Sequence, residues 1–481
     1  MQTPSIHTNS CLSDPESCSS PAAFDHVNAN DANPHDERPV ANDDLAHPHA
    51  TVVSLFSAGK VARASHLPEI PNSELNKVVS MLQAVEHQTV SDFDRNVYCL
   101  LGIPIDAVNM EQALLHVRDA ALRRQQCFLS TPNLNFLIGC QRDATFRGSL
   151  INSNLNIVDG LPLAWMARRL GIPVLRRVTG SGLFEKLMAA PEQSGRKLSV
   201  YFFGGQDGVA QTACRNLNEG AYGLSCAGAQ SPGFGSVEAL STPETIDRIN
   251  ASGADFLVVS LGARKGQAWI EHNMHRLNVP VVSHLGAVVN FVAKTVDRAP
   301  DAFQKYGLEW LWRIKEEPAL WSRYWNDGIG MLNLLLTRVL PHVAYRKLRC
   351  ASMFMRPDYA AVQLDKSPTE CRIALFGAVP DVVPSQIREA LKNAALMETD
   401  VLVDLNETHH LSPAAFGLLL ILRKHQTAAG KSLRFTGLSR RMRRLFQWNG
   451  VEYLLTDAAA TPACKPVAAI STRAALEATS L

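Results

Sequence analysis

Four short polar or glycine-containing segments each follow an apolar run directly. They are Thr131-Pro132-Asn133, Asp159-Gly160, Gly204-Gly205 and Gly262-Ala263. The first two segments carry hydroxyl, amide and carboxylate groups, which can hydrogen-bond a ligand or exchange a proton with it. The glycines allow backbone amides to approach a phosphate closely. These four segments are therefore the first candidates for a binding or catalytic site.

Arginines supply the cationic groups that a phosphate-bearing ligand requires. A planar guanidinium group can donate two parallel hydrogen bonds to phosphate oxygens. Arg298, Arg313 and Arg323 are the candidates, although each could instead form a surface ion pair.

Structural roles are also open for the polar candidates. Asp159 precedes a segment with Pro162 that is predicted to be helical, so its carboxylate could cap that helix. Thr131 and Asn133 are ordinary residues for a turn between a strand and a helix.

The elements that must position these residues alternate between strand and helix from about residue 97 to residue 324. The predicted strands are Cys127–Ser130, Asn156–Val158, Leu198–Phe203, Phe256–Leu261 and Val279–Leu285. Helical stretches separate them, as in the helix from Met110 to Arg123, where Asn109 and Gln112 resemble a capping box. This alternation predicts an α/β fold with a Rossmann-like parallel sheet, in which ligands bind beyond the carboxyl ends of the strands.

Composition excludes several other classes of protein. The chain has 46% hydrophobic and 19% charged residues, which is typical of folded domains, and its net charge of +2 does not favour a nucleic-acid partner. Ten cysteines without a CxxC pair or zinc spacing favour reduced thiols, with neither a disulfide framework nor a metal site. No signal peptide or membrane-spanning run is found, so we expect a cytoplasmic protein with at most peripheral membrane contact.

Changes in composition divide the chain into six segments. Residues 1–70 are predicted to be a disordered acidic tail, and residues 71–95 an amphipathic helix or linker. A larger α/β domain covers 96–325, and an aromatic and basic helical linker covers 326–368. A smaller α/β domain at 369–460 and a flexible tail at 461–481 complete the chain.

The linker region allows two interpretations. Trp310, Trp321 and Trp325 precede basic residues near Arg349, which suits a membrane interface or the phosphates of a lipid-linked substrate. The apolar stretch from Ile329 to Leu340 could equally be a buried helix between domains.

The smaller domain has strand-like segments at Ile373–Phe376, Val401–Leu405 and Leu433–Thr436. Its clearest helix runs from Pro413 to about Ala428, with Ser412 as the N-cap and Gly430 beyond its end.

The larger domain resembles the WecG/TagA/CpsF family of glycosyltransferases along its whole length. The resemblance rests on an ordered series of short motifs: Val97 to Pro104, Thr131-Pro132-Asn133, Asp159-Gly160, Arg177-Val178-Thr179-Gly180, Phe203-Gly204-Gly205, Arg298-Ala299-Pro300, Gly307-Leu308-Glu309-Trp310 with Arg313, and Glu317-Pro318 ahead of Arg323-Tyr324. Each motif alone is weak, but chance would rarely produce all of them in this order.

This resemblance implies inverting transfer of a sugar from a nucleotide donor, typically a UDP-linked N-acetylmannosamine type, to a polyprenyl-diphosphate-linked acceptor. It implies Asp159 as the base, no metal ion and no cofactor. Thr131, Asn133 and Gly160 would contact substrate with Arg177, Gly204, Gly205, Gly262 and Gln267, while Arg298, Arg313 and Arg323 would hold diphosphates.

The chain departs from the family pattern at several positions. Gly182 replaces an acid, Arg264-Lys265-Gly266-Gln267 replaces Pro-Lys-Gln-Glu, and Asn290 and Lys294 replace Asp and Gly. A different donor sugar and a reduced activity are both compatible with these changes.

Residues from Cys371 to Leu455 resemble STAS domains, mainly through Val401-Leu402-Val403-Asp404-Leu405 and the helix that follows Ser412. The usual phosphoacceptor positions align with Pro413 and Ala414, so we expect binding of an unknown protein partner rather than a phosphorylation switch.

The leading hypothesis is a transferase of exopolysaccharide or capsule synthesis, bound peripherally to the inner face of the cell membrane. The alternative is a catalytically weakened scaffold that binds a glycolipid or nucleotide sugar and recruits a partner through its STAS-like domain. A nicotinamide-dependent dehydrogenase is disfavoured, because no G-x-G-x-x-G segment opens a helix after an early strand. The sequence leaves open the donor sugar, the acceptor glycan and the oligomeric state.

Overall fold

The computed structural model describes residues 92–174, 176–189, 196–220, 222–296, 299–300, 303, 309–316, 318–353 and 359–456. These residues belong to one compact unit that spans Pro71–Leu481. The predicted acidic tail, the helix expected near Leu75–Val85, Arg298 and the predicted tail from residue 461 lie outside the described residues.

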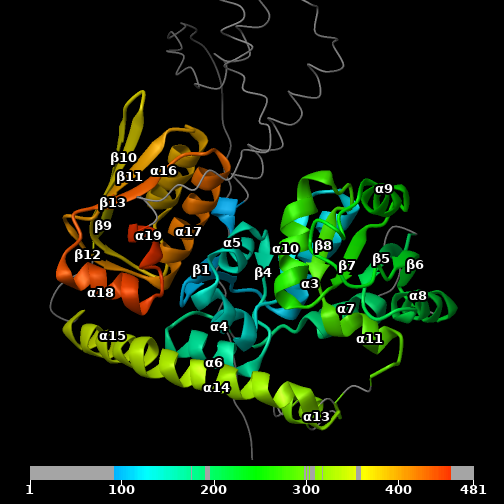
Figure 1. Cartoon of the computed structure of the whole chain (residues 1–481). Coiled ribbons are helices and arrows are strands. Elements are labelled where there is room, and N and C mark those ends of the chain that lie inside the picture. The colour runs from blue at the N-terminus through cyan, green and yellow to red at the C-terminus, as the bar shows by residue number, and fades with distance from the viewer. Residues whose placement is uncertain are drawn as a thin grey trace, which may run out of the picture. The chain divides into compact units, whose positions relative to one another are not determined.

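The larger domain is built on a six-stranded parallel sheet in the order β4-β3-β8-β7-β5-β6 (Figure 1). Its strands are β3 (Cys127–Ser130), β4 (Leu155–Asn156), β5 (Leu198–Gly204), β6 (Leu224–Gln230), β7 (Phe256–Ser260) and β8 (Val281–His284). The Rossmann-like parallel sheet predicted from the sequence is confirmed, and β6 is an additional edge strand.

Helices cover both faces of this sheet because alternate strand residues point to opposite sides. On β7, Phe256 and Val258 belong to one apolar cluster, whereas Leu257 and Val259 belong to another. The first cluster includes residues of α3 (Met110–Leu122), α7 (Gly180–Ala189), α8 (Val209–Glu219) and α11 (Gly286–Val292), and the second includes residues of α9 (Pro243–Ala251) and α10 (Ala263–Asn273). The remaining helices near the sheet are α4 (Leu134–Arg142), α5 (Ala144–Asn152) and α6 (Leu161–Arg169). The Asn109–Gln112 capping box of α3 is present as predicted.

A disulfide joins Cys214 of α8 to Cys226 of β6, and this corrects our expectation of reduced thiols. The two cysteines are 12 residues apart in the sequence, and they meet because α8 packs against β6. Cysteine spacing without the tertiary fold does not indicate that pairing.

A short antiparallel hairpin precedes the sheet. Its strands are β1 (Val97–Leu100) and β2 (Ile103–Asp106), and every residue of both strands is buried. The turn residues Leu101 and Gly102 both have left-handed φ angles, of 51° and 97°. A Cβ atom on Gly102 would lie 2.5 Å from the carbonyl oxygen of Gly450, so the turn fits closely under the second domain.

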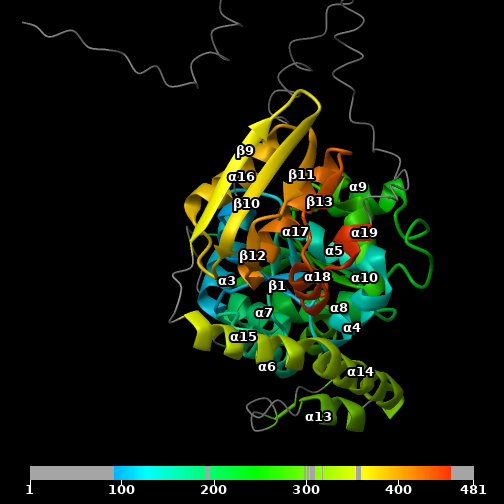
Figure 2. The same ribbon diagram turned by 90° about the vertical axis from the view of Figure 1, so that its left-hand side faces the viewer.

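The second domain has a five-stranded sheet with the path β12-β10-β11-β13 and with β9 antiparallel to β10. Its elements are β9 (Ala360–Lys366), β10 (Glu370–Val379), α16 (Ser385–Leu396), β11 (Asp400–Asp404), β12 (Thr408–Leu411), α17 (Pro413–Ala428), β13 (Leu433–Thr436), α18 (Arg440–Trp448) and α19 (Tyr453–Thr456). Figure 2 shows β9 and β10 as a long hairpin. Because β9 belongs to this sheet, the domain begins before the boundary we expected at residue 369.

One helical segment runs from the larger domain to the smaller one. It comprises α13 (Glu309–Glu316), a 3-10 turn, α14 (Trp321–Leu334), a π-helical stretch (Leu335–Val339) and α15 (Leu340–Met353). Pro341 has no N–H group to continue the α-helical pattern, which is a physical reason for the π-helical stretch before it. α14 packs against α4, and α15 packs against α18 (Figure 1).

This segment has one face toward the protein, as the interpretation of a buried helix predicted, and one exposed face, for which the membrane interpretation stays a prediction. Asp327, Leu334, Val339 and His342 are buried. The exposed face is an apolar stripe in which every side chain is more than half exposed: Trp321, Trp325, Ile329, Leu332, Leu336 and Leu340.

The two domains share a single apolar core. It includes the β1–β2 hairpin, α4 and α6 from the larger domain, and β10, β11 and α17 from the smaller one. α17 lies directly on β1, where a Cβ atom on Gly417 would be 2.6 Å from the carbonyl oxygen of Val97. Ser412 caps α17 as predicted, because its Oγ accepts a hydrogen bond from the Ala415 amide; the same hydroxyl donates to the carbonyl of Pro380.

Gly417→Ala should destabilise the protein, because the new methyl group meets the backbone of β1. We expect a loss of about 1–3 kcal/mol in the free energy of unfolding, typical of overpacking. Gly148→Ala is the matched control, since Gly148 is also within a helix but has open space at its Cβ position. That change should stabilise the protein by up to about 1 kcal/mol. Urea denaturation of both variants measures the difference, and equal effects would contradict close packing of α17 on β1.

Candidate active site

Asp159 lies just beyond the end of β4 and connects three loops. Its amide donates a hydrogen bond to the carbonyl of Pro132 at 2.9 Å, beside the end of β3. Its Oδ2 accepts a hydrogen bond from the amide of Gly180, the first residue of α7, at 3.2 Å. The N-cap of α6 is Gly160, with no side-chain hydrogen bond, so Asp159 does not cap the helix that follows it.

The environment of Asp159 raises its pKa to about 6. Burial is the main cause, and the negative charge of Glu309 adds to it. The Gly180 amide and the positive charges of Arg177 and Arg313 act in the opposite direction. A carboxyl group with a pKa near neutrality can both accept and release a proton at physiological pH.

Arg177 and Glu309 form an ion pair beside this carboxylate, with Nη2 and Oε1 2.8 Å apart. Arg177 comes from the loop before α7, whereas Glu309 and Arg313 come from α13. Residues far apart in the sequence thus place two guanidinium groups and two carboxylates in one electrostatic environment.

Thr131 and Asn133 lie next to the same loops. A Cβ atom on Gly180 would lie 3.1 Å from Cγ2 of Thr131, and one on Gly160 would lie 3.9 Å from Cβ of Asn133. The Oδ1 atom of Asn133 accepts a hydrogen bond from the Phe136 amide and so caps α4. The structural role that the sequence left open for Asn133 is therefore performed by its side-chain oxygen. Among the described residues, the side-chain amide nitrogen of Asn133 makes no hydrogen bond.

The backbone conformation and close packing explain why glycines follow β5, and the backbone conformation explains Gly262 after β7. Gly204 has a φ of 104°, and a Cβ atom there would lie 2.4 Å from the carbonyl oxygen of Ser260. The amide of Gly205 donates a hydrogen bond to the same carbonyl at 2.8 Å, so it is already engaged within the protein. Gly262 caps α10 with a φ of 80° and has open space at its Cβ position.

Gln267 requires a correction. We expected it to contact substrate, but its side chain is fully buried, and its Nε2 donates a hydrogen bond to Oγ of Ser130 at 3.0 Å. Ser130 also hydrogen-bonds Ser153, so Gln267 supports the ends of β3 and α5 from inside the protein.

Arg323 lies on α14, where its Nε is 4.0 Å from Oδ2 of Asp327. Asp327 in turn accepts a hydrogen bond from Asn135 of α4 at 3.1 Å. This contact brings α14 to the beginning of α4, two residues after Asn133. The structure thus gathers Thr131, Asn133, Asp159, Gly160, Arg177 and Arg313 around the ends of β3 and β4, and places Gly204, Gly205 and Gly262 at the ends of β5 and β7.

Sequence reasoning missed two features of this region. Glu309 was noted only as part of a motif, and its pairing with Arg177 needs the tertiary fold. His284, at the end of β8, was not noted at all: its ring is buried, its Nε2 has no partner among the described residues, and burial with nearby Arg323 lowers its pKa to about 4. A Cβ atom on Gly266 would lie 2.2 Å from this ring, so the glycine in the altered Arg264-Lys265-Gly266-Gln267 segment makes room for His284.

Within the described residues, no group of three or more His, Cys, Asp or Glu side chains is arranged to hold a metal ion. The arrangement around Asp159 offers a carboxylate for proton transfer and guanidinium groups for anionic oxygens.

Comparisons with known proteins indicate the family to which the chain belongs. Residues 98–344, just over half of the chain, match the model of the glycosyl transferase WecG/TagA/CpsF family, and residues 362–456 match the model of the STAS domain. The chain is also similar to an N-acetylglucosaminyldiphosphoundecaprenol N-acetyl-beta-D-mannosaminyltransferase from Bacillus spizizenii. The two proteins are 26% identical over 196 residues, which are 41% of this chain and 74% of the relative.

Asp159→Asn should stabilise the folded protein at high pH. The pKa of Asp159 is higher in the folded protein than in the unfolded chain, so its ionised carboxylate opposes folding above pH 6. This effect decreases as the pH falls toward the pKa that Asp159 has in the unfolded chain. Since each pKa unit corresponds to about 1.4 kcal/mol, we expect the variant to gain about 3 kcal/mol near pH 8 and about half of that near pH 5. Urea denaturation at both pH values measures this gain, with Asp119→Asn on the exposed side of α3 as the control. A gain that is equal at both pH values would show that the carboxylate is not perturbed.

Proposed function

Because the chain belongs to the WecG/TagA/CpsF family of glycosyltransferases, we propose that it transfers a hexose from a nucleotide donor to a polyprenyl-diphosphate-linked acceptor with inversion. We further propose a UDP-linked donor of the N-acetylmannosamine type or a related hexose. The Bacillus spizizenii relative, whose name specifies an N-acetylmannosaminyl group and an undecaprenol-linked acceptor, supports this choice.

The observation that carries the proposal is the position and protonation behaviour of Asp159. Inverting transfer needs a base that removes the proton from the acceptor hydroxyl as that oxygen attacks the anomeric carbon. The bond from this carbon to the donor diphosphate breaks at the same time, and the diphosphate leaves with the electron pair. Asp159 lies at the carboxyl end of the sheet, and its pKa of about 6 leaves it mostly ionised at neutral pH yet basic enough to accept that proton.

The cationic residues around the site suit the diphosphates of the two substrates. Arg177 and Arg313 lie near Asp159, where they can stabilise the departing diphosphate electrostatically without a metal ion. Arg323 on α14 and Arg298 are assigned to the diphosphate of the lipid carrier. Thr131, Asn133 and Gly160 orient the sugar, and the glycines after β5 and β7 form the wall on the donor side.

The apolar stripe on α14 and α15 is proposed as the membrane-docking surface. Among the described residues, no helix is both long and apolar enough to span a bilayer. A polyprenyl acceptor stays in the membrane, so the transferase must work at the bilayer surface. Two tryptophans at one end of the stripe and exposed Lys347 near the other suit the inner, anionic leaflet. Exopolysaccharide or capsule assembly is the proposed pathway.

A catalytically weakened scaffold is the second candidate. The observation that favours it is Gly266, where the family has a glutamine and where this chain places the His284 ring. Under this alternative, the crevice would bind nucleotide sugar without turnover.

Asp159→Asn should lower acceptor-dependent release of nucleoside diphosphate by about 10²–10⁴-fold, the usual contribution of a general base. The assay uses a panel of UDP- and GDP-sugars with a soluble prenyl-diphosphate-linked sugar as acceptor. Asp119→Asn is the control and should retain wild-type turnover. Saturable donor binding without release by the wild type would establish the scaffold instead, whereas full activity of Asp159→Asn would remove Asp159 from the mechanism.

The double variant Trp325→Glu and Leu336→Glu should weaken binding to phosphatidylglycerol vesicles by at least about tenfold, since each buried side chain of this size contributes about 1.5–3 kcal/mol. Flotation measures the bound fraction. Leu115→Glu, at an exposed apolar position on α3, is the matched control and should bind like the wild type. Unchanged binding of the double variant would place the membrane contact elsewhere.

A further inference from the structure

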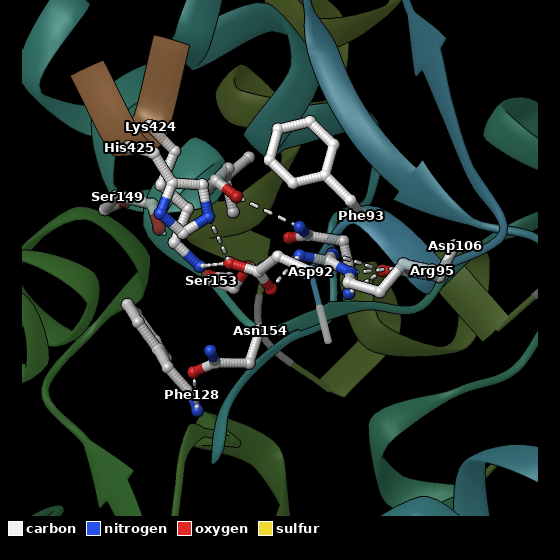
Figure 3. Close-up of polar contacts among 12 residues, drawn as sticks. Asp92, Phe93, Arg95, Asp106, Phe128, Ser149, Ser153, Asn154, Lys424 and His425 are labelled. Atoms are coloured by element: carbon white, nitrogen blue, oxygen red, sulfur yellow. Dashed lines mark hydrogen bonds and ion pairs between the residues drawn. The ribbon is translucent and has the colours of Figure 1, made fainter. Parts of the chain in front are cut away.

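The carboxylate of Asp92 is buried between the two domains, with 1% of its side chain exposed. Its Oδ2 lies 2.7 Å from Nζ of Lys424 and 3.1 Å from Nε2 of His425, both on α17 (Figure 3). Its Oδ1 lies 3.3 Å from Nη1 of Arg95, in the larger domain. Burial acts to raise the pKa of Asp92, but Lys424, His425 and Arg95 outweigh it and hold this pKa well below its usual range. Asp92 is thus a buried anion held by cations of both domains.

The contacts continue from Arg95 into the sheet. Arg95 donates two hydrogen bonds to Asp106 at the end of β2, from Nε at 3.0 Å and from Nη2 at 2.7 Å. Oδ2 of Asp106 accepts a hydrogen bond from the amide of Asn156 at 2.7 Å, and Nη1 of Arg95 donates to the carbonyl of Ser153 at 3.1 Å. Asn156 is the last residue of β4, three residues before Asp159. A continuous chain of charged hydrogen bonds therefore links α17 of the STAS domain to the strand that ends three residues before the proposed base.

Residues of the STAS domain also hydrogen-bond the β1–β2 hairpin and the residues just before it. Arg388 of α16 donates hydrogen bonds to the carbonyls of Phe93 and Arg95. The hydroxyl of Tyr453 donates to the carbonyl of Gly102 at 2.9 Å. Together with the packing of Gly417 on Val97, these contacts place residues of α16, α17 and α19 against the chain's own larger domain.

We propose that the STAS domain is a positioning device for the transferase in the same chain, and that Lys424 and Asp92 hold the end of β4 so that the Asp159 carboxylate stays aligned with the acceptor hydroxyl. This inference rests on the proposed function of Asp159. Bidentate and buried charged contacts define geometry more narrowly than apolar packing does. Alignment matters because a displacement of about 1 Å in a reacting group can lower a rate about 10²-fold.

Arg338 and Glu452 provide a matched comparison. This ion pair also joins the two domains, with Nη2 and Oε1 2.5 Å apart. Among the described residues, neither partner has a hydrogen bond to β2, to β4 or to Asp92. Its loss should weaken the interface without altering β4.

The experiment uses the full chain with Lys424→Met, Asp92→Asn and Glu452→Gln, assayed well below each variant's melting temperature. We expect Lys424→Met and Asp92→Asn to lower kcat about 10–100-fold, with little change in KM for donor or acceptor. Hydrogen exchange of residues 155–160 should become faster in both. The double variant should be no worse than the poorer single variant, because both act on one contact. Lys424→Arg, which keeps the charge, should restore most of kcat, and Glu452→Gln should retain wild-type kcat and exchange.

Wild-type kcat and exchange in Lys424→Met and Asp92→Asn would overturn the inference and leave the network with a purely structural role. Should Asp92→Asn fail to fold, His425→Gln tests the same carboxylate with a smaller change. Asp159→Asn distinguishes a failure of the proposed base from a failure of the positioning role. Turnover by Asp159→Asn would refute the proposed base, whereas its inactivity beside a fully active Lys424→Met would refute only the positioning role.

Discussion

The β1–β2 hairpin has no solvent-facing side, and the relation between the two domains depends on this constraint. A two-stranded hairpin is marginally stable alone in water, so both of its faces need cover. The end of β4 and α5 lie against it within the larger domain, and α17 lies on it from the smaller domain. The apolar core consequently crosses the boundary between the two family matches without interruption.

Burial of this hairpin also explains why charged residues lie inside the interface. Asp92, Arg95 and Asp106 flank the strands, and the packing of α17 removes them from water. A buried charge is tolerated only when it is paired and hydrogen-bonded, which restricts the arrangements that the interface can adopt. In the orientation that the two domains adopt, Asp92 meets both Lys424 and Arg95.

Much of the fold could be predicted from local sequence. Strongly apolar strands such as Phe256–Ser260 were found nearly to the residue, and α17 was bounded correctly by Ser412, Pro413 and Gly430. The strand β6 was missed because Leu224–Gln230 is rich in small residues and lacks an alternating pattern. The hairpin strands contain four residues each, and their burial depends on a helix that lies more than 300 residues later in the chain.

The candidate site was likewise predictable from local sequence only in part. Asp159 could be proposed as the base because it follows an apolar strand within a recognisable motif. The pairing of Arg177 with Glu309, the buried position of Gln267 and the disulfide between Cys214 and Cys226 all depend on tertiary contacts that no local pattern encodes. The position of a residue along the chain indicated that it lies near the crevice, but not whether its side chain faces the ligand or the core.

The close contact between Gly417 and Val97 has a consequence for how such a chain could arise or be re-engineered. A module exchanged between proteins is ordinarily joined by a linker and retains its own complete surface. Here a STAS domain from another protein would need a glycine at this position of its helix, and it would have to leave the hairpin turn free beneath Gly450. The two parts are therefore expected to have been adjusted to each other as a single inherited unit, and a cut between residues 344 and 362 would expose apolar surface on both fragments.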